Sequence, residues 1–102
     1  MLYNTERTAT EEHPLVKTIL VVEDETTIGA LLMQIILQET PHQVLLVTDG
    51  FQALKVIREI MPNLFILDYR LPSMNGIDLY DQLHTIKGLE HTPKCLLTET
   101  RN

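Results

Sequence analysis

The sequence predicts an α/β fold in which helices cover both faces of a parallel sheet. Two short apolar runs, residues 19–22 (ILVV) and 64–67 (LFIL), lack polar alternation, which is typical of parallel strands buried on both faces. Segments with apolar residues at helical spacing separate such runs, so the expected order is strand, helix, strand, helix, strand, helix, strand. With 102 residues, of which 44% are hydrophobic, the chain suits one small domain and is too short for two.

The first predicted unit is a strand over residues 16–22 followed by a helix over residues 26–39. Five apolar side chains at helical spacing mark the main stripe of that helix: Ile28, Leu31, Leu32, Ile35 and Ile36. Beside this main stripe, Met33 and Leu37, with Ala30, form a second apolar stripe. A helix with two apolar stripes needs more than one neighbour to cover it.

The next two units repeat this order. Residues 44–47 (VLLV) predict the second strand, and a second helix is marked by Ala53, Leu54, Ile57, Ile60 and Met61 and stopped by Pro62. Residues 64–67 predict the third strand, residues 72–76 a loop, and Ile77, Tyr80 and Leu83 the inner face of a third helix that Gly88 ends. Residues 94–98 predict the fourth strand.

Acidic residues follow two of the predicted strands. Glu23 and Asp24 come directly after the first strand, and Asp68 follows the third. The carboxyl ends of parallel strands meet at one edge of a sheet, so three carboxylates should converge there. They would raise one another's pKa unless a cation such as Mg²⁺ or Ca²⁺ lay among them. The alternative is structural: residues 23–25 cap a helix and Asp68 begins a turn.

Composition restricts the partners and the compartment. Fourteen acidic residues against eight Lys and Arg give a net charge of −6, which disfavours direct nucleic acid binding. The chain shows no signal peptide and no apolar run long enough to span a membrane, so we expect a soluble, cytoplasmic protein. Residues 1–14 are polar and aperiodic, which predicts a flexible tail before a domain over residues 15–102.

The remaining reactive side chains predict no further site. Cys95 is the only cysteine, so no internal disulfide forms, and its place in an apolar run predicts a buried side chain. The four histidines, His13, His42, His84 and His91, have no metal-ligand spacing and are expected at the surface.

Three segments together carry a family resemblance. Residues 19–25 (ILVVEDE), 67–76 (LDYRLPSMNG) and 92–98 (TPKCLLT) resemble the receiver domain of two-component response regulators. An acidic pair, an Asp-x-x-x-Pro-x-x-x-Gly segment and a strand-terminal Thr seldom coincide by chance. The resemblance implies a flavodoxin-like (CheY-like) three-layer sandwich with strand order 2-1-3-4-5.

The resemblance also implies roles for individual residues. Asp68 would accept a phosphoryl group from a histidine kinase or phosphotransfer protein. Glu23, Asp24, Asp68 and the backbone carbonyl of Arg70 would hold Mg²⁺. Thr98 would contact the phosphoryl group and act as the switch, although taken alone it is an ordinary strand residue. Pro72 and Gly76 would shape the loop after the acceptor, with Gly76 supplying a conformation that other residues resist.

The sequence also departs from the family. It stops at Asn102, so we expect a receiver that lacks the last helix, strand and helix, together with the usual lysine and aromatic switch residue. Lys94 should lie about 13 Å from the acidic edge and does not replace that lysine. Glu99 stands where the family usually has a small residue, and its charge would repel a phosphoryl group. The fourth strand would be an open edge, which predicts homodimerisation through the first helix and that strand, or a partner chain there.

Three functions are therefore weighed. The first is a phosphoacceptor receiver, and the second is an interaction or dimerisation module that works without phosphorylation. The third is a fragment of a longer response regulator or a non-functional remnant. An enzyme that acts on other substrates is disfavoured, because the sequence shows no separate nucleophile, lid or substrate pocket. Any catalysis is expected to concern phosphorylation and dephosphorylation of its own aspartate.

Overall fold

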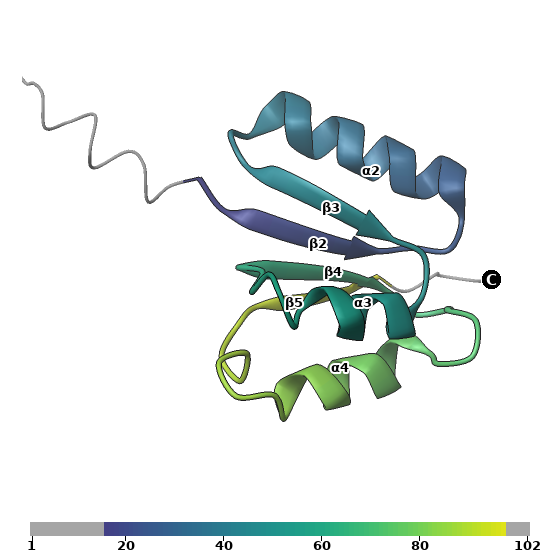
Figure 1. The fold of residues 1–102 in the computed structure, drawn as a ribbon. Coiled ribbons are helices and arrows are strands. Elements are labelled where there is room, and N and C mark those ends of the chain that lie inside the picture. The colour runs from purple at the N-terminus through teal and green to yellow at the C-terminus, as the bar shows by residue number, and fades with distance from the viewer. Residues whose placement is uncertain (1–15, 98–102) are drawn as a thin grey trace, which may run out of the picture.

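The sheet has four parallel strands in a computed structural model that describes residues 16–97. Its strands are β2 (Thr18–Val22), β3 (Gln43–Val47), β4 (Leu64–Asp68) and β5 (Lys94–Leu97), in the order β3-β2-β4-β5 (Figure 1). In chain order this is 2-1-3-4, which agrees with the predicted flavodoxin-like arrangement. The predicted tail over residues 1–14 and Thr98 lie outside the described residues.

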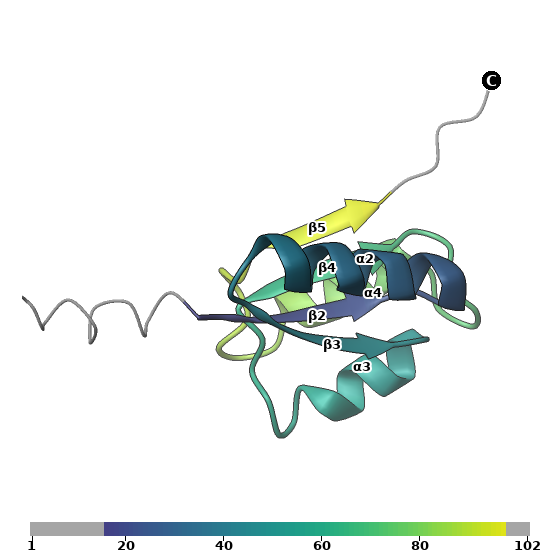
Figure 2. The ribbon, with the colours of Figure 1, turned by 90° about the horizontal axis from the view of Figure 1, so that it is seen from above.

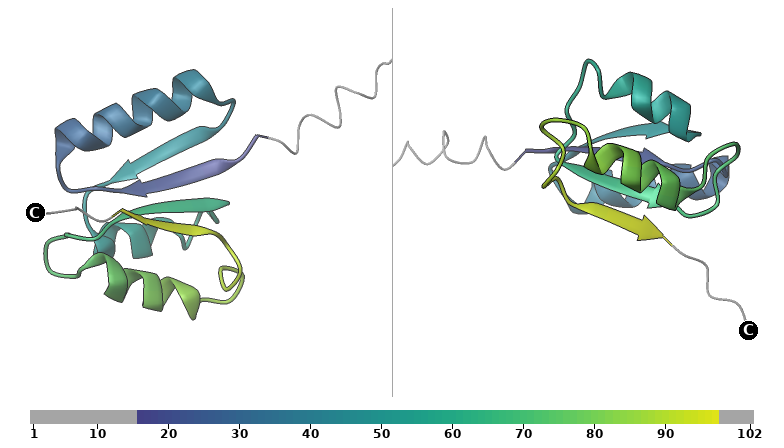
Figure 3. Two further views of the ribbon diagram at one scale, coloured as in Figure 1. Left: turned by 180° about the vertical axis from the view of Figure 1, so that it is seen from behind. Right: turned by 90° about the horizontal axis from the view of Figure 1, so that it is seen from below.

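Helices cover both faces of the sheet, as predicted. Helix α2 (Thr26–Glu39) lies on one face against β3 and β2. Helices α3 (Gly50–Val56) and α4 (Gly76–His84) lie on the other, where α4 contacts β4 and β5 (Figure 1 and Figure 3). The chain therefore forms the three-layer sandwich that the apolar strands require.

The core lies between the sheet and the α3–α4 layer. Alternate residues of each strand point to this side, since side chains alternate across a strand. The largest fully buried members of the core cluster are Leu20, Val22, Phe65, Leu67, Leu79, Leu83 and Leu89. Ile19 and Val21 are also buried, at the intervening positions of β2, so β2 is buried on both faces.

The predicted main stripe of α2 is wrong in part. Ile28, Leu31 and Ile35 are about half exposed, and Gly29 is the only fully buried residue of the helix. A Cβ at Gly29 would lie 3.0 Å from Leu46 Cδ1, so the helix approaches β3 along its glycine face. This close approach turns Ile28, Leu31 and Ile35 away from the sheet.

Helix α3 is shorter than predicted. It ends at Val56, and Ile60 and Met61 are 40% and 48% exposed instead of forming its inner face. The amides of Arg58 and Glu59 bond to carbonyls only three residues back, which tightens the chain into a turn after the helix. Pro62 restricts the preceding residue to extended conformations, and that also disfavours a longer helix.

The predicted inner face of α4 is also wrong in part. Ile77 and Tyr80 are 44% and 37% exposed, whereas Leu79 and Leu83 are fully buried. The helix starts with the Asn75 side chain accepting a hydrogen bond from the Asp78 amide at 2.9 Å. The rotation of the helix follows from its buried first residue, Gly76, which packs against the end of β4.

Cys95 is exposed, so the predicted buried position is wrong. It lies in β5, at one border of the sheet (Figure 2), and pairs with Ile66 of β4. Among the described helices, α2 packs on β2 and β3, and α3 and α4 pack on the opposite face. Because no described helix contacts that side of β4 and β5, the thiol faces solvent.

Candidate metal and phosphoryl site

Three carboxylates converge at the carboxyl edge of the sheet, as the strand ends predict. Glu23, Asp24 and Asp68 each offer one oxygen, and these oxygens lie within 4.8 Å of one another. The register of the two central strands causes this, because Val22 pairs with Leu67 and the next residues are Glu23 and Asp68. The adjacent strands β2 and β4 thus end side by side in acid.

Glu23 is the buried member of the group. Its exposed fraction is 4%, and its amide donates to the Val47 carbonyl at 3.0 Å, which extends the β2–β3 pairing to the acid. The pKa of Glu23 is raised to about 7, mainly by burial. A hydrogen bond from the Glu25 amide opposes this rise, and a hydrogen bond and charge from Asp68 and the charge of Asp24 add to it. Burial and acidic neighbours both disfavour the charged form of this carboxyl.

The alternative structural interpretation is only partly supported. Glu25 is the N-cap residue of α2, yet its side chain makes no capping hydrogen bond. Glu23 Oε2 accepts from the Glu25 amide at 3.0 Å, which orients the buried carboxylate but caps no helical amide. Asp68 does begin a turn, since its Oδ1 accepts from the Arg70 amide at 3.2 Å. That bond engages one of the two Asp68 carboxylate oxygens with the backbone.

The donor set fits Mg²⁺. All three groups supply carboxylate oxygens, the ligands that hard divalent cations prefer. One side chain is buried, one half-buried and one exposed. The three carboxylates are therefore accessible to solvent from one side, and the buried side chain is fixed by its surroundings. A cation among the three would favour ionised Glu23 against the burial and the neighbouring acidic charges that hold its pKa high.

Gly76 shapes the loop after Asp68 through a close backbone contact. The prediction that it supplies an unusual backbone conformation is wrong, because Gly88 is the described glycine with a positive φ. A Cβ at Gly76 would collide with the Asp68 carbonyl oxygen and lie 2.9 Å from Tyr69 Cα. The Gly76 amide donates to the Tyr69 carbonyl at 2.8 Å. The start of α4 therefore packs directly against the backbone of Asp68 and Tyr69.

Two predicted roles at the site stay untested. Thr98 lies outside the described residues, and the role of the Arg70 carbonyl stays a prediction. Lys94 begins β5, and its Nζ donates to the carbonyls of Leu89 at 2.7 Å and Thr92 at 2.8 Å, beside the amino end of that strand.

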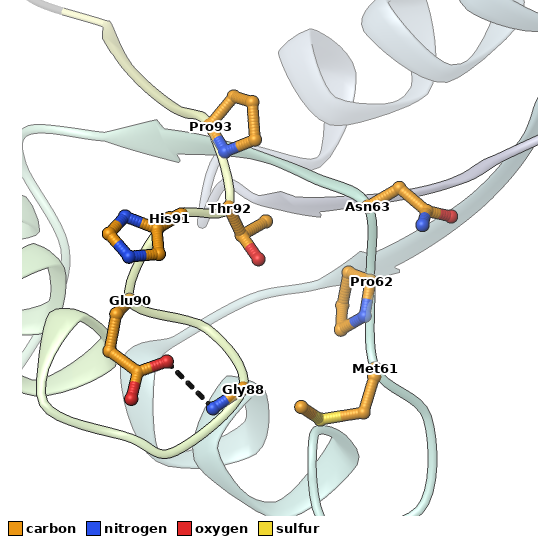
Figure 4. Close-up of a pocket in the computed structure, with 8 residues that line it drawn as sticks. All are labelled: Met61, Pro62, Asn63, Gly88, Glu90, His91, Thr92 and Pro93. Atoms are coloured by element: carbon orange, nitrogen blue, oxygen red, sulfur yellow. Dashed lines mark hydrogen bonds between the residues drawn. The ribbon is translucent and has the colours of Figure 1, made fainter.

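A surface pocket lies at the opposite end of the sheet (Figure 4). It is formed by the segments that lead into β4 and β5, and includes Met61, Pro62, His91 and Pro93. Glu90 at its rim accepts a hydrogen bond from the Gly88 amide at 2.8 Å (Figure 4). None of the three converging acids lines this pocket, so it is separate from the acidic site.

Sequence reasoning missed one buried residue of the loop after Asp68. Met74 is only 8% exposed and belongs to the core cluster, whereas the sequence predicted only a loop over residues 72–76. The sequence feature that could have indicated this burial is a single apolar residue between the polar residues Ser73 and Asn75.

Comparison with known proteins decides the family. Residues 19–102 match the family described as the response regulator receiver domain. The chain belongs to this family. It is 39% identical over 80 residues to the DNA-binding response regulator MtrA of Mycolicibacterium paratuberculosis, and the match covers 78% of this chain and 34% of that protein. The chain thus spans about a third of the length of that curated relative.

Solved receiver structures share the fold. A signal receiver domain of a histidine kinase from Syntrophus aciditrophicus has a TM-score of 0.78 and 33% identity, covering 85% of this chain and 65% of that one. The Mn(2+)-bound form of response regulator Rcp1 has a TM-score of 0.71 and 27% identity, covering 84% and 68%. The phosphorylated cyanobacterial phytochrome response regulator RcpA has a TM-score of 0.73 and 28% identity, covering 85% and 68%. This receiver domain therefore has the fold of two-component signalling proteins.

No described helix is both long and apolar enough to cross a membrane.

Proposed function

We propose that this receiver domain accepts a phosphoryl group on Asp68 from a histidine kinase or phosphotransfer protein, with Mg²⁺ held by Glu23, Asp24 and Asp68. The observation that carries the proposal is the convergence of these three carboxylates within 4.8 Å at one edge of the sheet. The similarity to RcpA, described as phosphorylated, and to Rcp1, described as Mn(2+)-bound, supports it.

The chemistry follows from the position of Asp68. Its half-buried carboxylate attacks the phosphorus of a phosphohistidine, the new O–P bond forms, and the P–N bond of the donor breaks. The imidazole nitrogen leaves with the electron pair, and Asp68 becomes an acyl phosphate. Mg²⁺, when bound, offsets the negative charge that gathers as one anion attacks another. Glu23 takes part as the ionised form, so its proton must leave first.

The remaining roles belong to the same proposal. The Arg70 carbonyl completes the cation site, and Thr98 contacts the transferred phosphoryl group. The domain acts in the cytoplasm and catalyses nothing beyond phosphorylation and dephosphorylation of its own aspartate.

The test is phosphorylation by a small donor. The protein is incubated with acetyl phosphate and Mg²⁺, and its intact mass is measured beside Asp68→Asn and Asp78→Asn. Asp78 is an exposed acid in the first turn of α4 and serves as the matched control. We expect one added phosphoryl group on the wild type and on Asp78→Asn, and none on Asp68→Asn. Equal labelling of Asp68→Asn, or an unlabelled wild type, would contradict the proposal.

A second candidate function is dimerisation without phosphorylation. It is favoured by the border position of β5, whose outer edge pairs with none of the described strands. Four apolar side chains of α2 are also about half exposed: Ile28, Leu31, Ile35 and Leu37. Unpaired strand edges and apolar helix surfaces are where further chains associate.

Sedimentation velocity at micromolar concentration tests this second candidate. The candidate predicts a dimer that Asp68→Asn leaves intact and Leu31→Glu disrupts. Gln34→Glu adds the same charge at another exposed position of α2 and should leave the dimer unchanged. A wild type that sediments as a monomer rules out the dimer.

A further inference from the structure

Met74 turns inward from the loop that follows the acceptor. Ser73 before it has a φ of 69°, a conformation that non-glycine residues rarely adopt. The Met74 amide donates to the Pro72 carbonyl at 2.7 Å. This tight turn directs the Met74 side chain into the core, where it is 8% exposed.

The sulfur of Met74 rests against the start of another helix. A Cβ at Gly50, the first residue of α3, would lie 2.8 Å from Met74 Sδ, so the sulfur occupies space that any other residue at position 50 would fill. Gln82 Nε2 of α4 contacts the same sulfur at 3.7 Å. Met74 therefore joins the acceptor loop to α3 on one side and to α4 on the other.

The loops that meet through this contact lie at the edge of the sheet that carries the acids. Gly50 follows Asp49, whose side chain caps α3 by accepting from the Gln52 amide at 2.8 Å. The same connection leaves β3 at Val47, whose carbonyl bonds to the Glu23 amide. The contact thus links the loop after Asp68 to the connection that is bonded to Glu23.

We propose that Met74 and the missing Cβ of Gly50 form a buried lock that positions the acceptor loop for cation binding. Both are positioning residues, because neither touches the carboxylates. This inference rests on the proposed function and adds how that site is held in place.

The lock matters because the loop is strained and the methionine is held in place by its burial and by its contact with Gln82. Met has three rotatable side-chain bonds and takes one position only where its surroundings fix it. A residue such as Ser73 keeps a positive φ only where the surrounding structure over-determines it. When the sulfur is displaced, the Ser73 turn relaxes and the backbone of Arg70, which bonds Asp68, moves with it.

A double-mutant cycle tests the lock with Gly50→Ala, Met74→Ala and the double variant. The measurements are Mg²⁺ affinity by calorimetry at pH 8 and amide hydrogen exchange over residues 69–75. We expect Gly50→Ala to weaken Mg²⁺ binding about fivefold, towards the lower end of overpacking costs, and to speed exchange in the loop. In the double variant the new methyl group at position 50 enters the space that the Met74 side chain has left. The double variant should therefore bind Mg²⁺ no more weakly than Met74→Ala does.

Phe51→Ala is the matched control, since Phe51 is the next residue and is 55% exposed; we expect wild-type affinity and exchange. The lock would be overturned if Gly50→Ala had the Mg²⁺ affinity and loop exchange of the wild type. It would also be overturned if the losses of affinity in the two single variants simply added in the double variant. If Gly50→Ala does not fold, recovery of folding in the double variant supports the lock and no recovery overturns it. If the wild type shows no Mg²⁺ affinity, the proposed function is refuted. Amide hydrogen exchange over residues 69–75 then still shows whether Gly50 and Met74 hold the loop.

Discussion

Glu23 is the residue on which the electrostatics of the site depend. It lies almost fully buried at the end of a central strand, with Asp24 and Asp68 beside it. Its pKa of about 7 in the absence of a cation means that Glu23 must lose a proton before all three carboxylates are ionised and can bind a metal ion. Proton release and cation binding should therefore be linked.

The raised pKa of Glu23 predicts how stability depends on pH. The folded state holds this proton up to about pH 7, whereas the unfolded chain releases it near 4.5. Stability from this group is fully present below pH 4.5 and falls as the pH rises through 7. At 1.36 kcal/mol per pKa unit, the free energy of unfolding of the wild type should fall by about 3 kcal/mol relative to that of Glu23→Gln between pH 4 and pH 8.

Urea unfolding of both proteins at pH 4 and pH 8, with EDTA present, measures this difference. Adding Mg²⁺ at pH 8 should restore stability to the wild type but not to Asp24→Asn. A wild type that gains stability relative to Glu23→Gln as the pH rises would contradict the assignment.

At the residue scale, the sequence predicted which acids meet but not how each is held. The apolar runs that end in Glu23 and Asp68 were sufficient to predict that these acids lie close together, because the carboxyl ends of parallel strands lie at one edge of the sheet. The burial of Glu23 depends on a backbone bond to Val47 in another strand. The role of Gly76 depends on contact with the Asp68 backbone. Contacts between segments distant in sequence leave no local pattern.

At the scale of elements, the helices formed where expected but rotated differently. α2 carries apolar residues around much of its circumference, so helical spacing alone did not select the side that faces the sheet. Gly29 in α2 and Gly76 in α4 decide the rotation, because a helix approaches closest along a face without a Cβ. The loss of the last predicted turns of α3 has a different cause, the tight turn before Pro62.

The packing of α4 on the end of β4 predicts a severe effect of Gly76→Ala. The added Cβ meets the backbone at Asp68 and Tyr69, which cannot move aside as a side chain does, and we expect a loss of about 3 kcal/mol in the free energy of unfolding. Gly29→Ala is the control: its Cβ meets side-chain atoms of Leu46, and helix propensity returns about 1 kcal/mol. Denaturant unfolding of the two variants provides the comparison, and equal losses would contradict this account of α4.

The connection between α4 and β5 is held by the Lys94 ammonium. Lys94→Met removes the donor to the Leu89 and Thr92 carbonyls, and we expect a loss of about 1–3 kcal/mol as these acceptors lose their partner. Lys87→Met, at an exposed position of the same connection, should change the unfolding free energy little. Thermal melts of both variants measure the effect, and a Lys94→Met protein as stable as Lys87→Met would show that these bonds contribute nothing.

At the scale of the whole molecule, the parallel sheet places the candidate chemistry at one edge. The order β3-β2-β4-β5 puts the two acid-ending strands side by side at its centre, which was predictable from the apolar runs and the resemblance together. The exposure of Cys95 was not, because burial in β5 depends on which helices reach the outer strands.

The central claim is that Glu23, Asp24 and Asp68 form one Mg²⁺ site in this receiver domain. Its most direct test is a Mg²⁺ titration at pH 8 followed by amide NMR of the wild type and Asp24→Asn. We predict saturable shifts at residues 23–25 and 68–70 of the wild type, and much weaker binding in Asp24→Asn. Unchanged amides at tens of millimolar Mg²⁺, an order of magnitude beyond the weak protein sites for hard divalent cations, or equal shifts in both proteins, would contradict it.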